Sequence, residues 1–225
     1  MDLVELFNRA AGNEGLQNLS QPVQVALLLG AFAVLPAALM TVTCYTRVII
    51  VLAFVRQGLA TQQIPPNMVL TGLALFLSLF IMRPTIEEIG DKAVDPYMKK
   101  QISGTEAARN GAAALQKFML RQTRKQDLAL FLHMANEKTV EEPEQTPFLV
   151  LVPAFVISEL KTAFIMGFCI YLPFLLVDLV VSSVLTSMGM VMMPPALISA
   201  PFKVLLFILA DGWHMIARAL AASYA

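Results

Sequence analysis

The sequence predicts an all-α protein of the membrane type, and three observations carry this prediction. Hydrophobic residues make up 57% of the 225 residues and charged residues only 14%, whereas a soluble domain is roughly 45–50% apolar and about 25% charged. Long segments lack charge altogether, and the periodic segments follow helical spacing. With 16 basic and 16 acidic residues in balance, this composition argues against a cytosolic enzyme, a nucleic-acid binder and a disordered chain.

The charged residues are concentrated in the middle of the chain. Twenty of the 32 lie within residues 83–147, while residues 15–46, 57–82 and 179–202 carry none. A helix that crosses a bilayer needs about 20 mostly apolar residues. The sequence therefore predicts four segments: a polar N-terminal segment (1–22), hydrophobic helices (23–82), a polar helical insert with an acidic linker (83–147) and hydrophobic helical hairpins (148–225).

The first hydrophobic segment predicts three helices. The first covers Val23–Thr43, with a possible bend at Pro36, and the second covers Arg47–Leu59. Pro65 and Pro66 end this run, because proline lacks a backbone donor and clashes with the preceding turn. The third helix covers residues 67–82. Arg47 and Arg56, which have no acidic neighbour, place the connection between the first spans in the cytoplasm and the insert on the far side.

The insert predicts two further helices. Ser103 and Glu106 have the spacing of a capping box, and acidic residues with Pro143 and Pro147 mark a linker after the helices. One face of each of these helices carries apolar residues, which indicate either two helices packed on each other or a self-association surface. These residues are Leu115, Phe118, Met119, Leu128, Phe131 and Leu132.

The C-terminal segment repeats the plan of the first one. An apolar stretch from Phe148 to Met193 meets Pro194 and Pro195, and a second apolar stretch runs to Ala222. Both halves thus contain helix, double proline and helix, which hints at the internal repeats of transporters.

Five charged residues lie in these apolar surroundings, where an unpaired charge costs at least about 2.5–3.5 kcal/mol. Three interpretations remain open: ion pairs within the protein or between subunits, ion or proton transport, and a water-filled path. Asp178 and Glu159 are the candidate partners of Lys203. The five residues are Glu159, Lys161, Asp178, Lys203 and Asp211.

A methionine-rich break precedes Pro194. Four of the 13 methionines, Met188, Met190, Met192 and Met193, fall within six positions that also include Gly189. Methionine is unbranched and repacks readily, so these side chains either seal a pore or fill a contact between helices.

The residues of catalytic and metal sites are missing. Cys44 and Cys169 lie in apolar runs and are expected to be small buried hydrophobic residues, and His133 and His214 show no metal-ligand spacing. No glycine-rich phosphate loop is present. We therefore expect no catalytic residue, no metal and no cofactor. The acidic start of the chain is not typical of a cleavable signal peptide.

Long strings of the sequence resemble one family. Cys44–Leu52 and Arg56–Asn67 are similar to the hallmark of the FliP/SctR export-gate proteins of type III secretion, and the similarity returns in Leu151–Phe164 and Val177–Leu185. Phe118–Arg124 is similar to the insert of the flagellar branch. The motif and helix-break residues are Arg47, Arg56, Gln57, Pro65, Pro66, Pro194 and Pro195.

This resemblance implies a fold and a set of partners. The fold is a set of membrane-associated bent helical hairpins with a helical polar insert, assembling as a ring. The partners are further copies of the chain in a pentamer, FliQ and FliR, with FlhA and FlhB in the same apparatus. Unfolded export substrates cross the channel, no nucleic acid is involved, and the protein performs no catalysis. The implied location is the bacterial inner membrane at the flagellar basal body, with much of the particle on the periplasmic side.

The resemblance also assigns a role to the methionines. Family members are expected to close the channel with three consecutive methionines, which correspond here to Met190, Val191 and Met192, with Met188 and Met193 beside them. The valine departs from that pattern. Two alternatives are an injectisome homologue and an assembly scaffold that does not line the channel.

Overall fold

The computed structural model describes residues 20–61, 64–135, 146–190 and 192–224. Most of the expected polar N-terminal segment, most of the acidic linker and Val191 therefore lie outside the described residues. Every regular element within the described ranges is helical, which confirms the predicted all-α class. The helices form two compact units.

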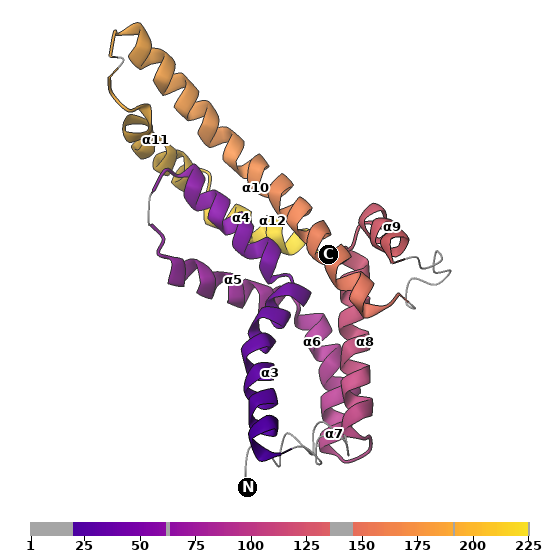
Figure 1. The fold of residues 1–225 in the computed structure, drawn as a ribbon. Helices are drawn as coiled ribbons and strands as arrows, with labels where there is room; N and C mark the ends of the chain where they lie inside the picture. The colour runs from indigo at the N-terminus through magenta and orange to yellow at the C-terminus, as the bar shows by residue number, and fades with distance from the viewer. Residues whose placement is uncertain (1–19, 62–63, 136–145, 191, 225) are drawn as a thin grey trace. The chain divides into compact units, whose positions relative to one another are not determined.

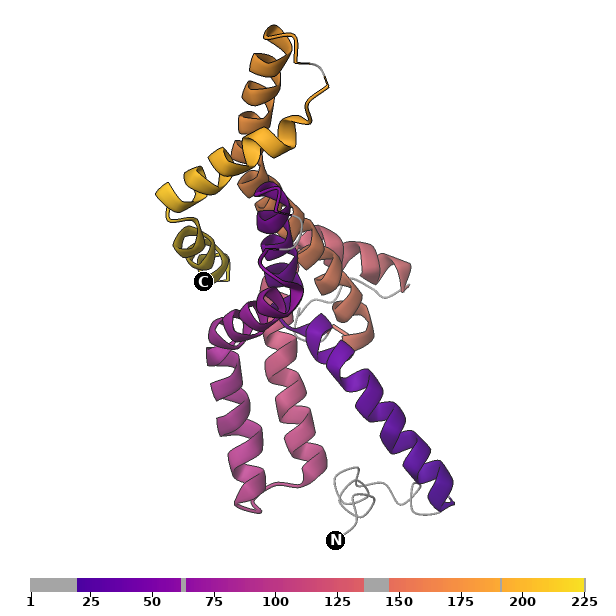
Figure 2. The same cartoon turned by 90° about the vertical axis from the view of Figure 1, so that its left-hand side faces the viewer.

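The described residues of the first unit are 20–43, 82–135 and 146–156. Its helices are α3 (Gln21–Val42), α6 (Arg83–Ile89), the π-helical turn η1 (Gly90–Val94), α7 (Asp95–Met98), α8 (Gly104–Gln122), α9 (Lys125–Met134) and the start of α10 (Phe148–Ser187). Figures 1 and 2 show α6 to α7 lying side by side with α8.

Two features of the insert bear on the predictions. The Ser103 hydroxyl accepts a hydrogen bond from the Glu106 amide at 3.2 Å, which confirms the predicted cap of α8. The helical run over residues 83–98 has no counterpart among the predicted helices. Pro84 allows it because proline is tolerated in a first helical turn, where the missing donor has no partner to lose.

The core of the first unit joins the insert to the start of α10. Met119, Leu151 and Phe155 are buried together with Val42, and the Phe118 and Phe155 rings meet edge to face at 6.0 Å. Phe118, Met119 and Leu128 thus pack within the chain. Leu132 is also buried, and Leu115 and Phe131 are half-buried.

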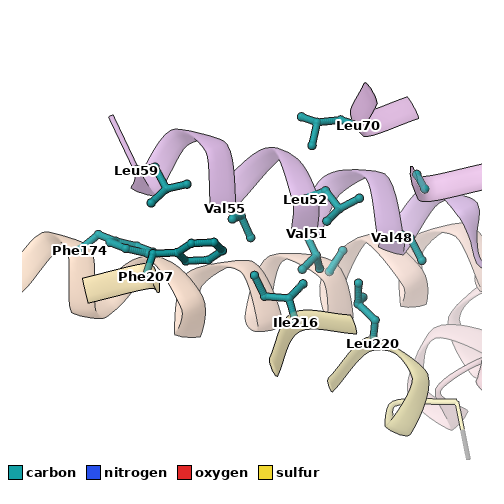
Figure 3. Close-up of a cluster of buried hydrophobic side chains, with 12 residues drawn as sticks. Val48, Val51, Leu52, Val55, Leu59, Leu70, Phe174, Phe207, Ile216 and Leu220 are labelled. Atoms are coloured by element: carbon teal, nitrogen blue, oxygen red, sulfur yellow. The ribbon is translucent and has the colours of Figure 1, made fainter. Parts of the chain in front are cut away.

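The described residues of the second unit are 44–61, 64–81, 157–190 and 192–224. Its helices are α4 (Tyr45–Gly58), α5 (Asn67–Ile81), most of α10, α11 (Pro195–Leu209) and α12 (Gly212–Ala222). Figure 3 shows the core, in which one face of α4 meets side chains of α5, α10, α11 and α12. Its labelled members are Val48, Val51, Leu52, Val55, Leu59, Leu70, Phe174, Phe207, Ile216 and Leu220.

The two units do not follow the four segments expected from charge. α4 and α5 come from the first hydrophobic segment but pack with C-terminal helices, while α3 groups with the insert. Hydropathy marks which residues avoid water, but it does not specify which apolar helices become neighbours.

Three close approaches in the second unit require glycine. A Cβ atom added to Gly58, Gly167 or Gly212 would lie 2.5, 2.4 or 2.2 Å from a ring carbon of Phe174, Phe54 or Phe207. These distances are shorter than any ordinary contact between carbon atoms, which lies near 3.5–4.0 Å. The glycines therefore let aromatic rings pack directly on helix backbones.

We expect Gly167→Ala to destabilise the second unit by about 1–3 kcal/mol, because the methyl group overpacks the Phe54 contact. Gly72→Ala is the matched control: Gly72 is also helical, and a Cβ there meets nothing within 4 Å. We expect it to stabilise the protein by about 0.5–1 kcal/mol. Thermal unfolding in detergent measures both changes, and equal melting temperatures for the two variants would contradict the packing argument.

One helix in the described part of the chain is long and apolar enough to cross a membrane. This is α10, which has 40 residues and a mean hydropathy of 2.4 over an 18-residue stretch. The number rises to as many as four if each of three bent helix pairs is counted as one span. The pair formed by α11 and α12 bends by 63°.

Candidate functional site

The methionines lie at the turn between α10 and α11, which form a hairpin within the second unit (Figures 1 and 2). Met192 is 99% exposed and Met188 is 68% exposed, and Met190 and Met193 are also exposed. Pro194 caps α11, and Pro195 begins it. Four flexible apolar side chains are therefore presented at one end of a two-helix hairpin, with no cover from the described part of this chain.

A buried ion pair links the start of α4 to α10. Arg47 is 2% exposed and Glu159 is 0% exposed. The Arg47 Nε donates to Glu159 Oε2 at 3.0 Å, and Nη2 donates to Oε1. This two-pronged geometry satisfies both carboxylate oxygens, as is typical of strong arginine–carboxylate pairs.

Two residues after α12 complete this arginine cluster, which we define as Arg47, Glu159, Ser223 and Tyr224. Arg47 Nη1 donates to the Ser223 carbonyl and hydroxyl oxygens at 3.2 and 2.9 Å. The guanidinium also stacks 3.8 Å from the centre of the Tyr224 ring, and the Tyr224 hydroxyl donates to Glu159. Burial, together with the charge of Glu159, raises the pKa of Tyr224 well above its usual range, so the phenol remains a donor.

A second charged cluster ties α10 to α11. Lys203, 3% exposed, donates to Asp178 Oδ2 at 2.6 Å, and the Ser199 hydroxyl donates to Oδ1 at 2.5 Å. We call Asp178, Ser199 and Lys203 the aspartate cluster. Of the two candidate partners of Lys203, the structure therefore selects Asp178, while Glu159 pairs with Arg47.

The expected five-residue charge network is thus replaced by two separate clusters. Lys161 is exposed because it follows Glu159 by two positions, which turns it about 200° around the helix. Asp211 is also exposed and has a left-handed backbone, with φ 49°. Its short polar side chain tolerates this conformation, so in the described chain it forms the turn before α12 and takes part in neither cluster.

The structure also changes the interpretation of the family-motif residues. Arg47 is buried in an ion pair, so it is not a free loop charge and gives no support to the predicted orientation. Arg56 donates to the Asn67 side chain, which ties the end of α4 to the start of α5 across Pro65 and Pro66. Gln57 is exposed.

Sequence reasoning missed Arg47 as the partner of Glu159. The two residues are 112 positions apart, and no local spacing connects them. The sequence nevertheless contained a signal for this pair, because Arg47 and Glu159 are both charged residues in apolar surroundings and each needs a partner.

Neither cluster has the features of a catalytic or metal site. The described residues contain no group of three or more histidine, cysteine or acidic side chains placed to hold a metal ion. Cys44 is buried and its thiol donates to the Ser78 carbonyl at 3.5 Å, whereas Cys169 is exposed, contrary to the expectation that both are buried.

The second unit leaves much apolar surface uncovered in the single chain. A hollow of about 670 Å³ between α10 and α11 is lined only by apolar residues, among them Val181, Leu185 and Phe202. Phe76 and Phe80 of α5 are also exposed. Contiguous apolar surface of this kind marks contact with lipid or protein.

These features define a helical membrane protein whose buried charges form ion pairs. A profile of the FliP family matches residues 28–220. The chain therefore belongs to the FliP family, whose members are export-gate components of the flagellum and not enzymes. This confirms the resemblance drawn from the sequence and its flagellar branch.

Curated relatives agree with this assignment. The chain is 51% identical over 208 residues to the flagellar biosynthetic protein FliP of Bacillus subtilis (strain 168), covering 92% of this chain and 94% of the relative. It is 50% identical over 210 residues to that of Pectobacterium carotovorum subsp. carotovorum, covering 93% and 81%. It is 44% identical over 212 residues to that of Aquifex aeolicus (strain VF5), covering 93% and 89%.

Proposed function

We propose that this chain is a wall subunit of the flagellar export channel and that the methionines between α10 and α11 form its constriction. The observation that carries this proposal is the placement of Met188, Met190, Met192 and Met193 at the exposed end of a hairpin. Adaptable thioether side chains suit a seal that must yield to a passing polypeptide and close again.

Further subunits complete the channel. One hairpin encloses no pore, so several copies must bring their methionines to a common axis. The uncovered apolar surface of α5, α10 and α11 provides the contact area. A ring of five copies assembled with FliQ and FliR, with FlhA and FlhB nearby, is the assembly that fits the family, and its substrates are unfolded flagellar subunits.

We place this assembly in the inner membrane at the flagellar basal body, with the charged insert on the periplasmic side. The charge segregation supports an insert that lies in water and not in lipid, because most charged residues lie within residues 83–147. Arg56 alone now supports the orientation through its basic charge. This orientation is tested with a cysteine introduced at exposed Lys99. The measurement is its reactivity toward an impermeant thiol reagent in intact spheroplasts.

The constriction is tested by cysteine cross-linking in the assembled complex. Cys44 and Cys169 are replaced by alanine, Met190→Cys is introduced, and the purified complex is oxidised. We expect disulfide-linked subunits, because a closed constriction brings residue 190 of neighbouring copies together. Leu130→Cys, at an exposed position on α9 in the other unit, is the matched control and is expected to remain unlinked.

Ion leakage separates the channel from a scaffold. We expect Met190→Ala with Met192→Ala to leak ions through an intact complex, because two of the four methionine side chains of the seal are reduced to a methyl group. Failure of residue 190 to cross-link in an intact complex, together with no leak from the alanine variant, would favour a scaffold that does not line the channel.

A further inference from the structure

We infer that Gly189 is a positioning residue for the constriction: its left-handed backbone ends α10 and directs Met190 out of the hairpin. This inference rests on the proposed function, because it concerns how one methionine of the constriction is held. Gly189 itself has no side chain to contribute to a seal.

The hydrogen bonds at this point form a Schellman motif. The Met190 amide donates to the Leu185 carbonyl at 2.9 Å, and the Gly189 amide donates to the Thr186 carbonyl at 3.0 Å. These are the two bonds that define this helix ending, in which the residue after the helix is left-handed and the next residue leaves the helix axis. The amide of Met190 is therefore anchored to the last turn of α10.

The backbone of Gly189 supplies the conformation that this motif needs. Its φ is +78°, in the region where a Cβ atom collides with the following carbonyl oxygen and where glycine is favoured. A Cβ built on Gly189 meets no other atom within 4 Å. A substitution here consequently tests backbone conformation by itself, without a clash against neighbouring side chains.

The motif gives the exposed methionines different degrees of restraint. Met190 follows directly from the anchored turn, and its carbonyl accepts a longer bond, of 3.5 Å, from the Met193 amide. Met192, the most exposed of the four, lies beyond Val191. Gly189 thus sets the direction in which the methionine segment leaves α10. Met190 is the methionine whose position depends on Gly189 most directly.

The test compares two substitutions that differ in their backbone preference. Gly189→Asn retains the left-handed conformation, which asparagine tolerates, whereas Gly189→Val disfavours it strongly, because valine is β-branched. Each is combined with Met190→Cys, Cys44→Ala and Cys169→Ala in the full complex, and the rate of disulfide formation at residue 190 is measured. We expect a fall on the order of tenfold with valine and a rate within about twofold of the glycine parent with asparagine.

The controls keep the outcomes distinct. Complex yield and melting temperature are measured for each variant, so that a fall in cross-linking counts only for assembled protein. Equal cross-linking rates for the valine, asparagine and glycine proteins would overturn the inference while leaving the constriction in place. Absence of cross-linking in the glycine parent would instead overturn the proposed function.

If the valine variant fails to assemble, Gly189→Ala, with a smaller bias against the left-handed region, provides the comparison with asparagine.

Discussion

We expect Glu159→Gln to destabilise the second unit by about 3–5 kcal/mol, the cost of leaving one member of a buried ion pair without its partner. The amide has nearly the shape of the carboxylate but no charge, so the Arg47 guanidinium stays buried without an opposite charge. Because natural proteins are stable by only about 5–15 kcal/mol, we expect a large loss of folded protein and of assembled complex. Thermal unfolding in detergent and the yield of complex measure it.

A matched control exists in the insert. Arg83 and Glu87 form an ion pair of the same chemistry one helical turn apart, with both side chains largely exposed. Water already solvates both groups, so we expect Glu87→Gln to leave the melting temperature unchanged. A melting temperature for Glu159→Gln equal to that of Glu87→Gln would refute the assignment of a structural role to the arginine cluster.

Removing both charges tests whether the unpaired charge of Arg47 causes the loss of stability. The double variant Arg47→Met with Glu159→Leu leaves no buried charge in the arginine cluster, and apolar replacements of buried pairs are often neutral. We expect it to recover much of the stability lost in Glu159→Gln. Full recovery is not expected, because Ser223 and Tyr224 also lose their hydrogen-bond partners.

Asp178→Ala is expected to reduce assembly nearly as strongly, because it leaves the Lys203 ammonium buried at 3% exposure without a carboxylate. Lys203→Met should have a smaller effect in the same direction. Its partner Asp178 is 29% exposed and keeps the hydrogen bond from Ser199, so water and the hydroxyl compensate part of its charge. The measurement is the yield of oligomer from membranes extracted in detergent.

The order of these two effects is the decisive result. A larger loss from Lys203→Met than from Asp178→Ala would mean that the aspartate is the more buried charge in the assembled complex. Normal oligomer yield from both variants would show that the aspartate cluster does not hold α10 and α11 together. In that case a transport role for the two residues would gain support over a structural one.

Local features were predictable wherever neighbouring residues decide the structure. The spacing of Ser103 and Glu106 predicts the start of α8, and Pro65, Pro66, Pro194 and Pro195 mark real interruptions of helices. The run over residues 83–98 was missed because its apolar residues form no clear stripe, and Ile86, Val94 and Met98 remain exposed. In the structure this run lies side by side with α8 (Figures 1 and 2).

The candidate site was predictable in its residues but not in its contacts. Sequence alone identified Glu159, Asp178 and Lys203 as charges out of place and the methionines as an interruption before α11. It grouped Lys161 and Asp211 with them because a list of charges contains no helix faces. It also assigned the six apolar residues of the insert partly to self-association, whereas Met119 is buried against α10 within the chain.

The sequence by itself determined the helical class, the family and the chemical character of the methionine segment, because composition, proline positions and long motif strings are properties of neighbouring residues. Only the tertiary structure decided that Arg47 pairs with Glu159 and that Lys203 pairs with Asp178. Only it showed that Gly189 has a left-handed backbone at the end of α10. The reason is physical: a buried charge is stabilised by whichever partner folding brings within hydrogen-bond distance, and no local pattern encodes that choice across 112 residues.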